Sequence, residues 1–356
     1  RRLFDRLGAW SVRDDQSLRA ELAELEGRSS GDYDGSALSE ARALFARALE
    51  TPGGLKIQTI HAFCEKLLRR FPLEAGISPG FRVMDDAATA AVAGAARKAV
   101  AQAAMRPDLP ALAEAYARMS VALDFASFNA MFAAFEARRG ALDAHFRRCG
   151  GGAGAAAAAW AACGFLDGPV APEVVEAEAR AGFDRRLWTA CAEVLALGGK
   201  ADQTAAARLR AVAAEPEPPL SAMLGALFTE GGEGAAAAWV GKTSGLKADE
   251  GLRMALLSEQ DRLEAARERL RSARVAQDTV YALTLASAYL EAYRIEKRAS
   301  GALDFADLIE RSRDLVAERP DAAWVLYKLD GGIDHILVDE AQDTAPEQWE
   351  IIGALT

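Results

Sequence analysis

Two short strand-like segments separated by a long alanine-rich block most constrain the fold of this chain. Residues 55–60 nearly alternate apolar and polar side chains, and residues 334–339 contain a fully apolar run that leads into an Asp-Glu pair. Between them, the spacing of apolar residues over 85–300 is overwhelmingly that of helices. The economical interpretation is one α/β domain that is interrupted by a large, mostly α-helical insertion.

The rest of the chain is predicted to be helical with a few joints. Residues 1–50 have helical spacing apart from a Ser/Gly/Asp-rich break at 27–36. Glycine- or proline-rich composition predicts loops at 150–159, 214–220 and 231–239. Leucines at helical spacing over 251–299 predict two long packed helices.

A short amphipathic helix is predicted directly after the first strand-like segment. Its apolar side chains form one stripe, which consists of Phe63, Cys64, Leu67, Leu68 and Phe71. Pro72 ends the helix because proline cannot continue it. Lys66, Arg69 and Arg70 lie off the stripe and form a local basic face, which we call the basic face below.

Composition excludes several classes of protein. The chain is 51% hydrophobic and 26% charged, which is typical of globular proteins. Its net charge of −10 means that any contact with nucleic acid must come from a local patch. Four scattered cysteines fit a reducing cytoplasm, and no apolar run reaches the length of a membrane span. Cys149 and Cys163, near His145, are the best metal candidates, although small buried thiols are the simpler interpretation.

The strongest candidate site follows the second strand-like segment, in the string Val338-Asp339-Glu340-Ala341-Gln342-Asp343-Thr344. Ligands of open α/β sheets bind at the carboxyl ends of strands, and carboxylate oxygens suit a Mg²⁺-nucleotide. Asp339 is the candidate Mg²⁺ ligand, and Glu340 could orient and deprotonate an attacking water. The alternative is a polar turn, in which Thr344 and Glu347 form a capping box and Pro346 lies in the first helical turn.

Three segments resemble motifs of one helicase family and occur in the family's order. Residues 338–344 resemble motif II (Walker B) of superfamily 1A helicases of the UvrD/Rep/RecB type, which read DExQD there. Residues 59–64, TIHAFC, resemble their single-strand DNA motif, and residues 303–308, LDFADL, resemble a segment just upstream of motif II. Residues 71–77 and 80–85 most resemble the AddA-type helicase–nuclease subunit of double-strand-break repair.

This resemblance implies an internal fragment of an ATP-dependent DNA helicase. Residues 1–84 would belong to a RecA-like P-loop motor domain, 85–300 to its inserted helical subdomain, and 301–356 to the return into the motor domain. ATP and Mg²⁺ are the implied cofactors. Single-stranded DNA, double-stranded DNA and an AddB-like subunit are the implied partners, and no membrane is involved. The family's P-loop would precede residue 1, so the fragment alone is expected to be inactive. Gly241-Lys242-Thr243 has Ala236 where a P-loop needs its first glycine.

The resemblance also assigns roles around the acidic string. By matching position, Asp339 would bind Mg²⁺ and Glu340 would activate the hydrolytic water. Gln342 would contact the nucleotide and, together with Asp343, link the nucleotide state to the DNA contacts. Asp304 of the LDFADL segment is expected to be a helix N-cap rather than a catalytic residue.

The DNA contacts are expected at the TIHAFC segment. By matching position, Thr59, His61 and Phe63 would touch the single strand, with Lys66 of the basic face beside them. Each has a plain structural alternative. Thr59 could serve only as an N-cap, Phe63 could belong to the core, and the basic residues could form a solvated face.

Three functions are compatible with the sequence. The first is an AddA-like helicase–nuclease, with exonuclease activity in the full-length protein. The second is a UvrD/Rep-type repair helicase without a nuclease. The third is a non-catalytic helical scaffold that retains a remnant of a motor domain.

Overall fold

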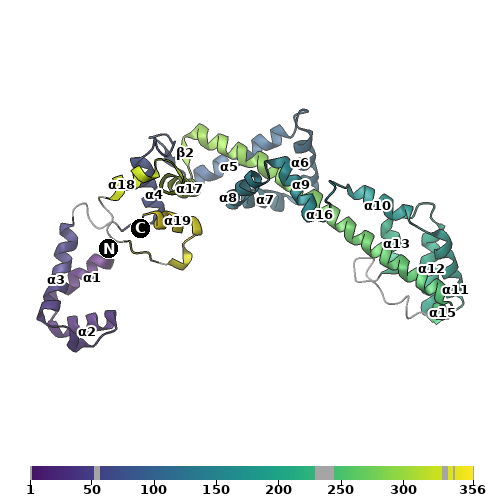
Figure 1. Ribbon diagram of the computed structural model, residues 1–356, viewed down its shortest axis with the longest axis horizontal. Helices are drawn as coiled ribbons and strands as arrows, with labels where there is room; N and C mark the ends of the chain where they lie inside the picture. The colour runs from purple at the N-terminus through teal and green to yellow at the C-terminus, as the bar shows by residue number, and fades with distance from the viewer. Residues whose placement is uncertain (1, 52–56, 229–243, 331–335, 340, 356) are drawn as a thin grey trace. The chain divides into compact units, whose positions relative to one another are not determined.

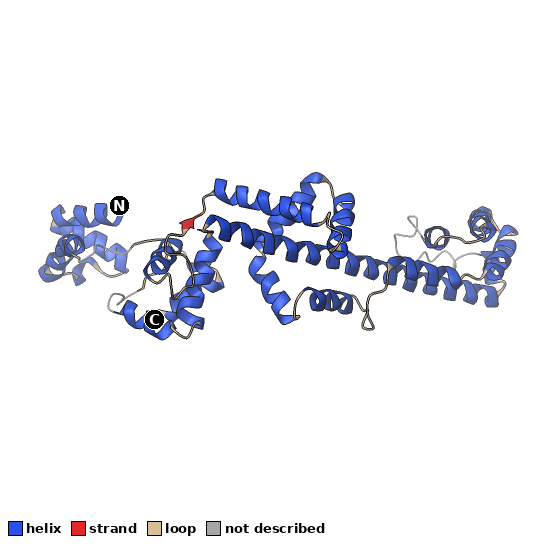
Figure 2. Ribbon diagram, turned by 90° about the horizontal axis from the view of Figure 1, so that it is seen from above, coloured by secondary structure: helices blue, strands red, loops and turns tan. Residues whose placement is uncertain are grey.

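The computed structural model describes residues 2–51, 57–228, 244–330, 336–339 and 341–355. The chain divides into two compact units: unit 1 is Arg1–Val83 with Leu303–Thr356, and unit 2 is Met84–Ala302. Figure 2 shows that helices make up nearly all of the regular structure. The mostly helical character expected for residues 85–300 is therefore confirmed for the described residues, which form helices joined by short connections.

Unit 1 combines helices from both ends of the chain. Its helices are α1 (Arg2–Val12), α2 (Asp15–Glu26), η1 (Ser30–Asp32), α3 (Gly35–Glu50), α4 (Ile60–Arg70), α17 (Phe305–Arg313), the π-helical turn η3 (Asp314–Glu318), α18 (Ala322–Asp330), η4 (Ala341–Asp343) and α19 (Pro346–Ala354). Two separate apolar clusters hold them. One joins α1, α2 and α3 around Trp10, Leu18 and Leu38. The other joins α4 to α17, η3, α18 and α19 around Leu68 and Leu308.

A two-stranded sheet lies where the chain leaves unit 1 and returns to it. The sheet pairs β1 (Arg82–Val83) with β2 (Ala302–Leu303). Because the two strands are hydrogen-bonded neighbours, the first and last residues of unit 2 are brought together. The chain therefore enters and leaves the helical block at one place.

Unit 2 is organised along a single long helix, α16 (Glu250–Ser300). The other helices of unit 2 are α5 (Asp86–Ala103), α6 (Pro110–Ala122), α7 (Phe125–Ala137), α8 (Arg139–Arg148), α9 (Gly152–Ala162), α10 (Pro172–Ala181), α11 (Arg185–Ala196), α12 (Lys200–Ala214), α13 (Leu220–Leu227) and α15 (Ser244–Lys247). Figure 1 shows them gathered along the two halves of α16.

The sequence predicted two helices where the structure has α16. No glycine or proline interrupts the chain between Leu252 and Ser300, so every backbone N–H can continue the hydrogen-bond ladder. The ends are capped: Asp249 accepts a hydrogen bond from the Leu252 amide at 3.0 Å, and Gly301 adopts the left-handed conformation (φ 60°). The prediction of two helices was wrong because a long apolar pattern without a breaker does not require a turn.

Two apolar clusters share α16. The aromatic cluster lies on its C-terminal half, where α5, α6 and α7 pack around Phe132, Tyr289 and Tyr293. The tryptophan cluster lies on its N-terminal half, where helices from α9 to α15 pack around Trp160 and Trp188. Burial of these large side chains gives each half of unit 2 its own core.

The two predicted strands are not found among the described residues. Residues 57–59 have no regular structure, and α4 already begins at Ile60. Residues 336–338 have none either, and the Leu337 side chain is 98% exposed. Residues 55, 56, 334 and 335 of these segments lie outside the described part of the chain. A strand needs a hydrogen-bonded neighbour, and the sheet that the described residues form consists of β1 and β2.

The predicted joints had mixed outcomes. The break at 27–36 is confirmed, since Gly27 ends α2 in the left-handed conformation (φ 63°) and α3 begins at Gly35. The proline-rich segment is confirmed as the connection between α12 and α13. The loop at 150–159 was wrong because most of it lies in α9, where a run of alanines outweighs the glycines. The segment 231–239 lies outside the described residues.

Candidate functional site

The N-terminus of α4 carries the first group of candidate residues. Thr59 is the N-cap, and its hydroxyl oxygen accepts a hydrogen bond from the Ala62 amide at 3.3 Å. The N-cap role expected for Thr59 is therefore confirmed, and its DNA contact stays a prediction. The first turn of a helix presents further backbone N–H groups and the positive end of the dipole, which favour an anion such as phosphate. Thr59 thus shapes this helix end whether or not it also touches a ligand.

His61 and Phe63 differ in their surroundings. The His61 ring is half-buried and lies edge-on to Phe305, the first residue of α17, with 5.2 Å between the ring centroids. Phe63 is also half-buried and packs against the apolar cluster of α4, α17 and α19. Core packing therefore occupies much of the Phe63 side chain, whereas His61 lies at the end of the helix that faces solvent.

The basic face is exposed, and its side chains have partners. The Lys66 ammonium donates to the Gln58 side chain at 2.7 Å, next to the TIHAFC segment. Arg69 donates to Glu65 one turn earlier (2.8 Å), and Arg70 donates to a backbone carbonyl of α18. These contacts hold the cations close to the helix. The pair of Arg69 and Glu65 is an exposed ion pair, and such pairs contribute little to stability, so Arg69 can exchange its partner for a phosphate at low cost.

Cys64 is the one cysteine inside a candidate motif. Its side chain is fully buried in the α4 stripe. Burial raises the pKa of the Cys64 thiol to about 11, because the thiolate would lose its hydration. Cys64 is therefore a packing residue, with no free thiolate at neutral pH to act as a nucleophile or a metal ligand.

The acidic string is exposed where the structure describes it. Asp339, Gln342 and Asp343 all face solvent, and Gln342 and Asp343 belong to the 3₁₀ turn η4. Glu340, the candidate base, lies outside the described residues. Carboxylate oxygens such as those of Asp339 and Asp343 are the donor type that Mg²⁺ prefers.

The predicted capping box after the acidic string was wrong in its residues. Helix α19 begins at Pro346, as expected for proline in a first turn. Its N-cap is Ala345, whose amide donates to the Gln348 side chain at 3.3 Å. Thr344 and Glu347 therefore lie one position before the residues that cap the helix. Thr344 is left without a capping role, as a polar residue between η4 and α19.

Helix α17 connects the two candidate segments. Asp304 caps it: its carboxylate accepts from the Asp307 amide at 2.8 Å, and Asp307 accepts in return from the Asp304 amide at 3.0 Å. This confirms the expected N-cap. Both α4 and α19 pack against α17. At the far end of α17, Arg313 approaches Glu350 of α19 within 3.8 Å. A movement of α4 or of α19 would therefore be transmitted to the other helix through their contacts with α17.

The sequence did not single out Phe305 or Arg313. Phe305 stands in the LDFADL string, but its contact with His61 depends on how α17 and α4 pack. Arg313 lies beyond the string, and its carboxylate partners come from two elements, η3 and α19. No local pattern signals the contact between Arg313 and Glu350 of α19, because these residues are far apart in the sequence.

Of the cysteine and histidine metal candidates, Cys149 and His145 lie close together. Cys149 and His145 are one turn apart on and just after α8, with 3.8 Å between the sulfur and the nearer ring nitrogen. Within the described part of the chain, no group of three or more His, Cys, Asp or Glu side chains could hold a metal ion. The described helices also include none that is long and apolar enough to cross a membrane.

Comparison with known families identifies one match. The model of the UvrD/REP helicase N-terminal domain matches residues 32–356. The match covers the TIHAFC, LDFADL and acidic segments together with the whole of unit 2. No curated protein matches the chain.

Proposed function

Because the chain belongs to the UvrD/REP helicase family, whose members are ATP-dependent DNA helicases, we propose that it is the motor segment of an AddA-type helicase–nuclease. In this role it would help to move the protein along single-stranded DNA and to unwind or resect DNA ends during double-strand-break repair. The observation that supports a working motor is the packing of α4 and α19 against one helix, α17. A segment that binds DNA and a segment that binds nucleotide are thereby joined.

The acidic string would serve the nucleotide. Asp339 would hold Mg²⁺, which shields the charge on the phosphates of ATP when both are bound. Glu340 would orient the attacking water and accept its proton. Gln342 would contact the nucleotide. Together with Asp343, it would link the state of the bound nucleotide to the DNA contacts. The exposed carboxylates of Asp339 and Asp343 are of the donor type that this role needs.

The first turn of α4 would contact the single strand. His61 would face the DNA, with Phe305 behind it to hold the ring in place. Lys66 would add a cation for the phosphate backbone, and the capped helix end would add backbone amides. Thr59 and Phe63 would mainly position this turn. Phe63 is the residue for which base stacking has the least support, since it packs into the core.

The AddA-type assignment rests on residues 71–77 and 80–85, which lie between α4 and α5. It brings with it a nuclease activity, an AddB-like partner subunit, duplex DNA ends as substrate and a cytoplasmic location. A UvrD/Rep-type helicase without a nuclease shares the motor but not these features. Degradation of linear duplex DNA in the presence of ATP and Mg²⁺ separates the two, since a helicase alone leaves the strands intact.

The test uses the protein that carries this chain. Glu340→Gln is expected to lower ATP turnover about 10²–10⁴-fold, because the general base is lost, while single-strand binding remains. Glu347→Gln, an exposed carboxylate on α19, is the matched control and should leave turnover unchanged.

His61→Ala tests the DNA side of the same proposal. It is expected to reduce the stimulation of ATP turnover by single-stranded DNA without reducing nucleotide binding, and His145→Ala in unit 2 is its control. Normal turnover in Glu340→Gln would remove Glu340 from the mechanism. Full stimulation in His61→Ala would remove α4 from the DNA interface.

A further inference from the structure

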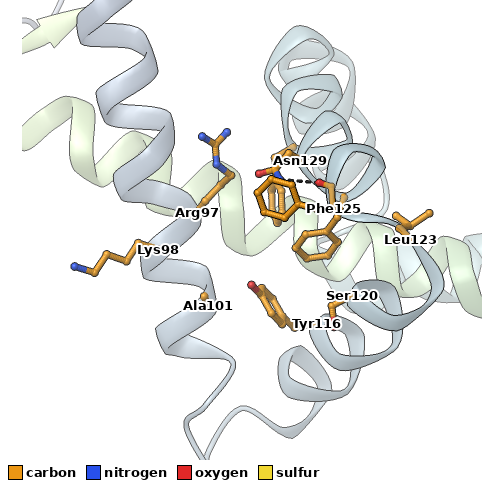
Figure 3. Close-up of a pocket in the computed structure, with 10 residues that line it drawn as sticks. Arg97, Lys98, Ala101, Tyr116, Ser120, Leu123, Phe125 and Asn129 are labelled. Carbon is orange, nitrogen blue, oxygen red and sulfur yellow. Dashed lines mark hydrogen bonds between the residues drawn. The ribbon is translucent and has the colours of Figure 1, made fainter.

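Unit 2 contains a cleft that the motor motifs do not use. It lies between α5 on one side and α6 and α7 on the other, with a volume of about 460 Å³. Ten residues line it: Arg97, Lys98, Ala101, Tyr116, Ser120, Leu123, Phe125, Phe128, Asn129 and Phe132. Figure 3 shows Arg97 and Lys98 on one helix, with Tyr116 and Phe125 across the opening from it.

The wall of the cleft is a series of aromatic rings that runs from the core to the surface. Phe132 is buried against Tyr289 of α16, with ring centroids 4.9 Å apart. Phe128 packs edge-on to Phe132 and to Tyr116, at 5.3 Å in each case. At the outer end, Phe125 is 86% exposed. The core fixes the inner rings, so the outer faces are held in place before any ligand arrives.

Phe125 is exposed although its position is well defined. It is the first residue of α7, and the Asn129 side chain donates to its carbonyl oxygen at 2.7 Å. The preceding Asp124 is occupied as the N-cap, since its carboxylate accepts from the Ser127 amide at 2.7 Å. An aromatic side chain has few torsions to order on binding, so an exposed ring on a held backbone is typical of a contact residue.

The charge of the cleft favours an anionic ligand. Its ten lining residues include two cations and no carboxylate. Arg97 is half-buried, Lys98 is exposed, and neither has an ion-pair partner within 4 Å among the described residues. This contrasts with the net charge of −10 of the whole chain. Exposed rings beside unpaired cations match a flat, apolar group that is joined to a phosphate.

We propose that this cleft binds an unpaired base of single-stranded DNA, with Phe125 and Tyr116 stacking on the base and Arg97 and Lys98 contacting the adjacent phosphates. The proposal rests on the proposed function for the presence of DNA, but it adds a contact in unit 2, apart from α4. Stacking on aromatic side chains together with backbone cations is the general way in which proteins bind single strands without reading their sequence. The cleft would give the helical unit a direct contact with the single strand.

The test compares two oligonucleotides of equal length, oligo-dT and an abasic strand with the same phosphates, bound to the 356-residue chain. Phe125→Ala is expected to weaken oligo-dT binding about five- to tenfold and to remove the preference over the abasic strand. Phe125→Leu should lose the same preference, because leucine is apolar but cannot stack. The matched control is Val121→Ala, since Val121 is 88% exposed and outside the cleft.

Two further readouts locate the contact. Arg97→Gln is expected to weaken binding of both strands and to reduce the salt dependence by about one phosphate contact. An oligonucleotide that carries 5-iodouracil should crosslink to α6 or α7 in the wild-type chain and lose that crosslink in Phe125→Ala.

Several outcomes would overturn the inference. One is Phe125→Ala binding both strands as the wild type does. Another is a crosslink that forms elsewhere. A third is tighter binding of an acidic, phenylalanine-containing peptide than of oligo-dT, together with unchanged peptide binding in Phe125→Leu. None of these bears on the ATP turnover of Glu340→Gln or the DNA stimulation of His61→Ala, so the proposed function fails or survives separately.

Discussion

The two units of this chain cover their apolar side chains to different degrees. In unit 2 one helix, α16, carries two continuous cores, and the largest side chains of both are buried. In unit 1 the clusters are smaller and separate, and apolar residues near the candidate site are exposed, with Ile57 at 71% and Leu337 at 98%. Both exposed residues belong to segments whose sequence predicts strands.

The difference shows where the energy of each unit comes from. Unit 2 is made of helices whose backbone hydrogen bonds are internal, so packing alone completes the structure. Even its buried polar groups are paired: Trp188 donates to Glu259 at 3.1 Å, and Glu259 accepts from Arg262 at 2.7 Å. A strand-like segment cannot form its backbone hydrogen bonds within itself and needs a neighbouring strand. The candidate nucleotide segment therefore depends more than the helices of unit 2 on partners elsewhere in the fold.

Two buried thiols allow the units to be followed separately. Cys64 lies in unit 1 and Cys191 in unit 2, and both are fully buried. Burial raises the pKa of each thiol to about 11, so both remain protonated and shielded at pH 8. The rate at which each reacts with a thiol reagent therefore reports the opening of its own unit.

The largest expected effect breaks the core of unit 2. Trp188→Ala removes a fully buried ring and leaves Glu259 without its indole partner, which should cost about 3–5 kcal/mol of unfolding free energy. Urea titration should show the loss, and Cys191 labelling should accelerate while Cys64 labelling does not. Trp349→Ala, at a half-exposed ring on α19, is the control. Equal acceleration at both cysteines would mean that the two units unfold as one.

A second change tests whether α16 couples the two cores of unit 2. Asp278 is exposed between the tryptophan and aromatic clusters, so Asp278→Pro removes one helical hydrogen bond without touching either core. The expected cost is about 3 kcal/mol, and unfolding followed by circular dichroism should separate into two steps. Asp278→Ala should keep the single transition that we expect for unit 2 of the wild type. A single unchanged transition in the proline variant would show that the cores do not depend on a continuous α16.

The smallest effect concerns the contact between α4 and α17 in unit 1. Phe305→Ala removes the ring that lies edge-on to His61 and should cost about 0.5–1.5 kcal/mol. Cys64 labelling should become slightly faster, and Cys191 labelling should not change. Tyr327→Ala, at a ring that is 73% exposed in the same unit, provides the comparison. If both variants behave alike, α17 does not support α4 through this contact.

Much of the candidate site could be anticipated from the sequence. The apolar stripe of α4, its stop before Pro72 and the caps at Thr59 and Asp304 all follow from local rules, and the structure has them. The partners of His61 and Arg313 could not be anticipated, because Phe305 and Glu350 reach them only through the packing of α17. The cleft of unit 2 was missed for the same reason, since its rings and cations come from three helices.

The sequence by itself determined the helices and the motifs. Helix hydrogen bonds join residues four apart, so alanine content, apolar spacing and caps are sufficient to specify them. Tertiary structure decided what depends on distant partners: the continuity of α16 as a shared core, the role of α17 between the candidate segments, and whether a strand-like run forms a strand. Leu337 shows the limit most clearly, since its apolar neighbours predict burial and the structure leaves it in solvent. Hydrogen bonds between strands come from elsewhere in the fold, and no local pattern can supply them.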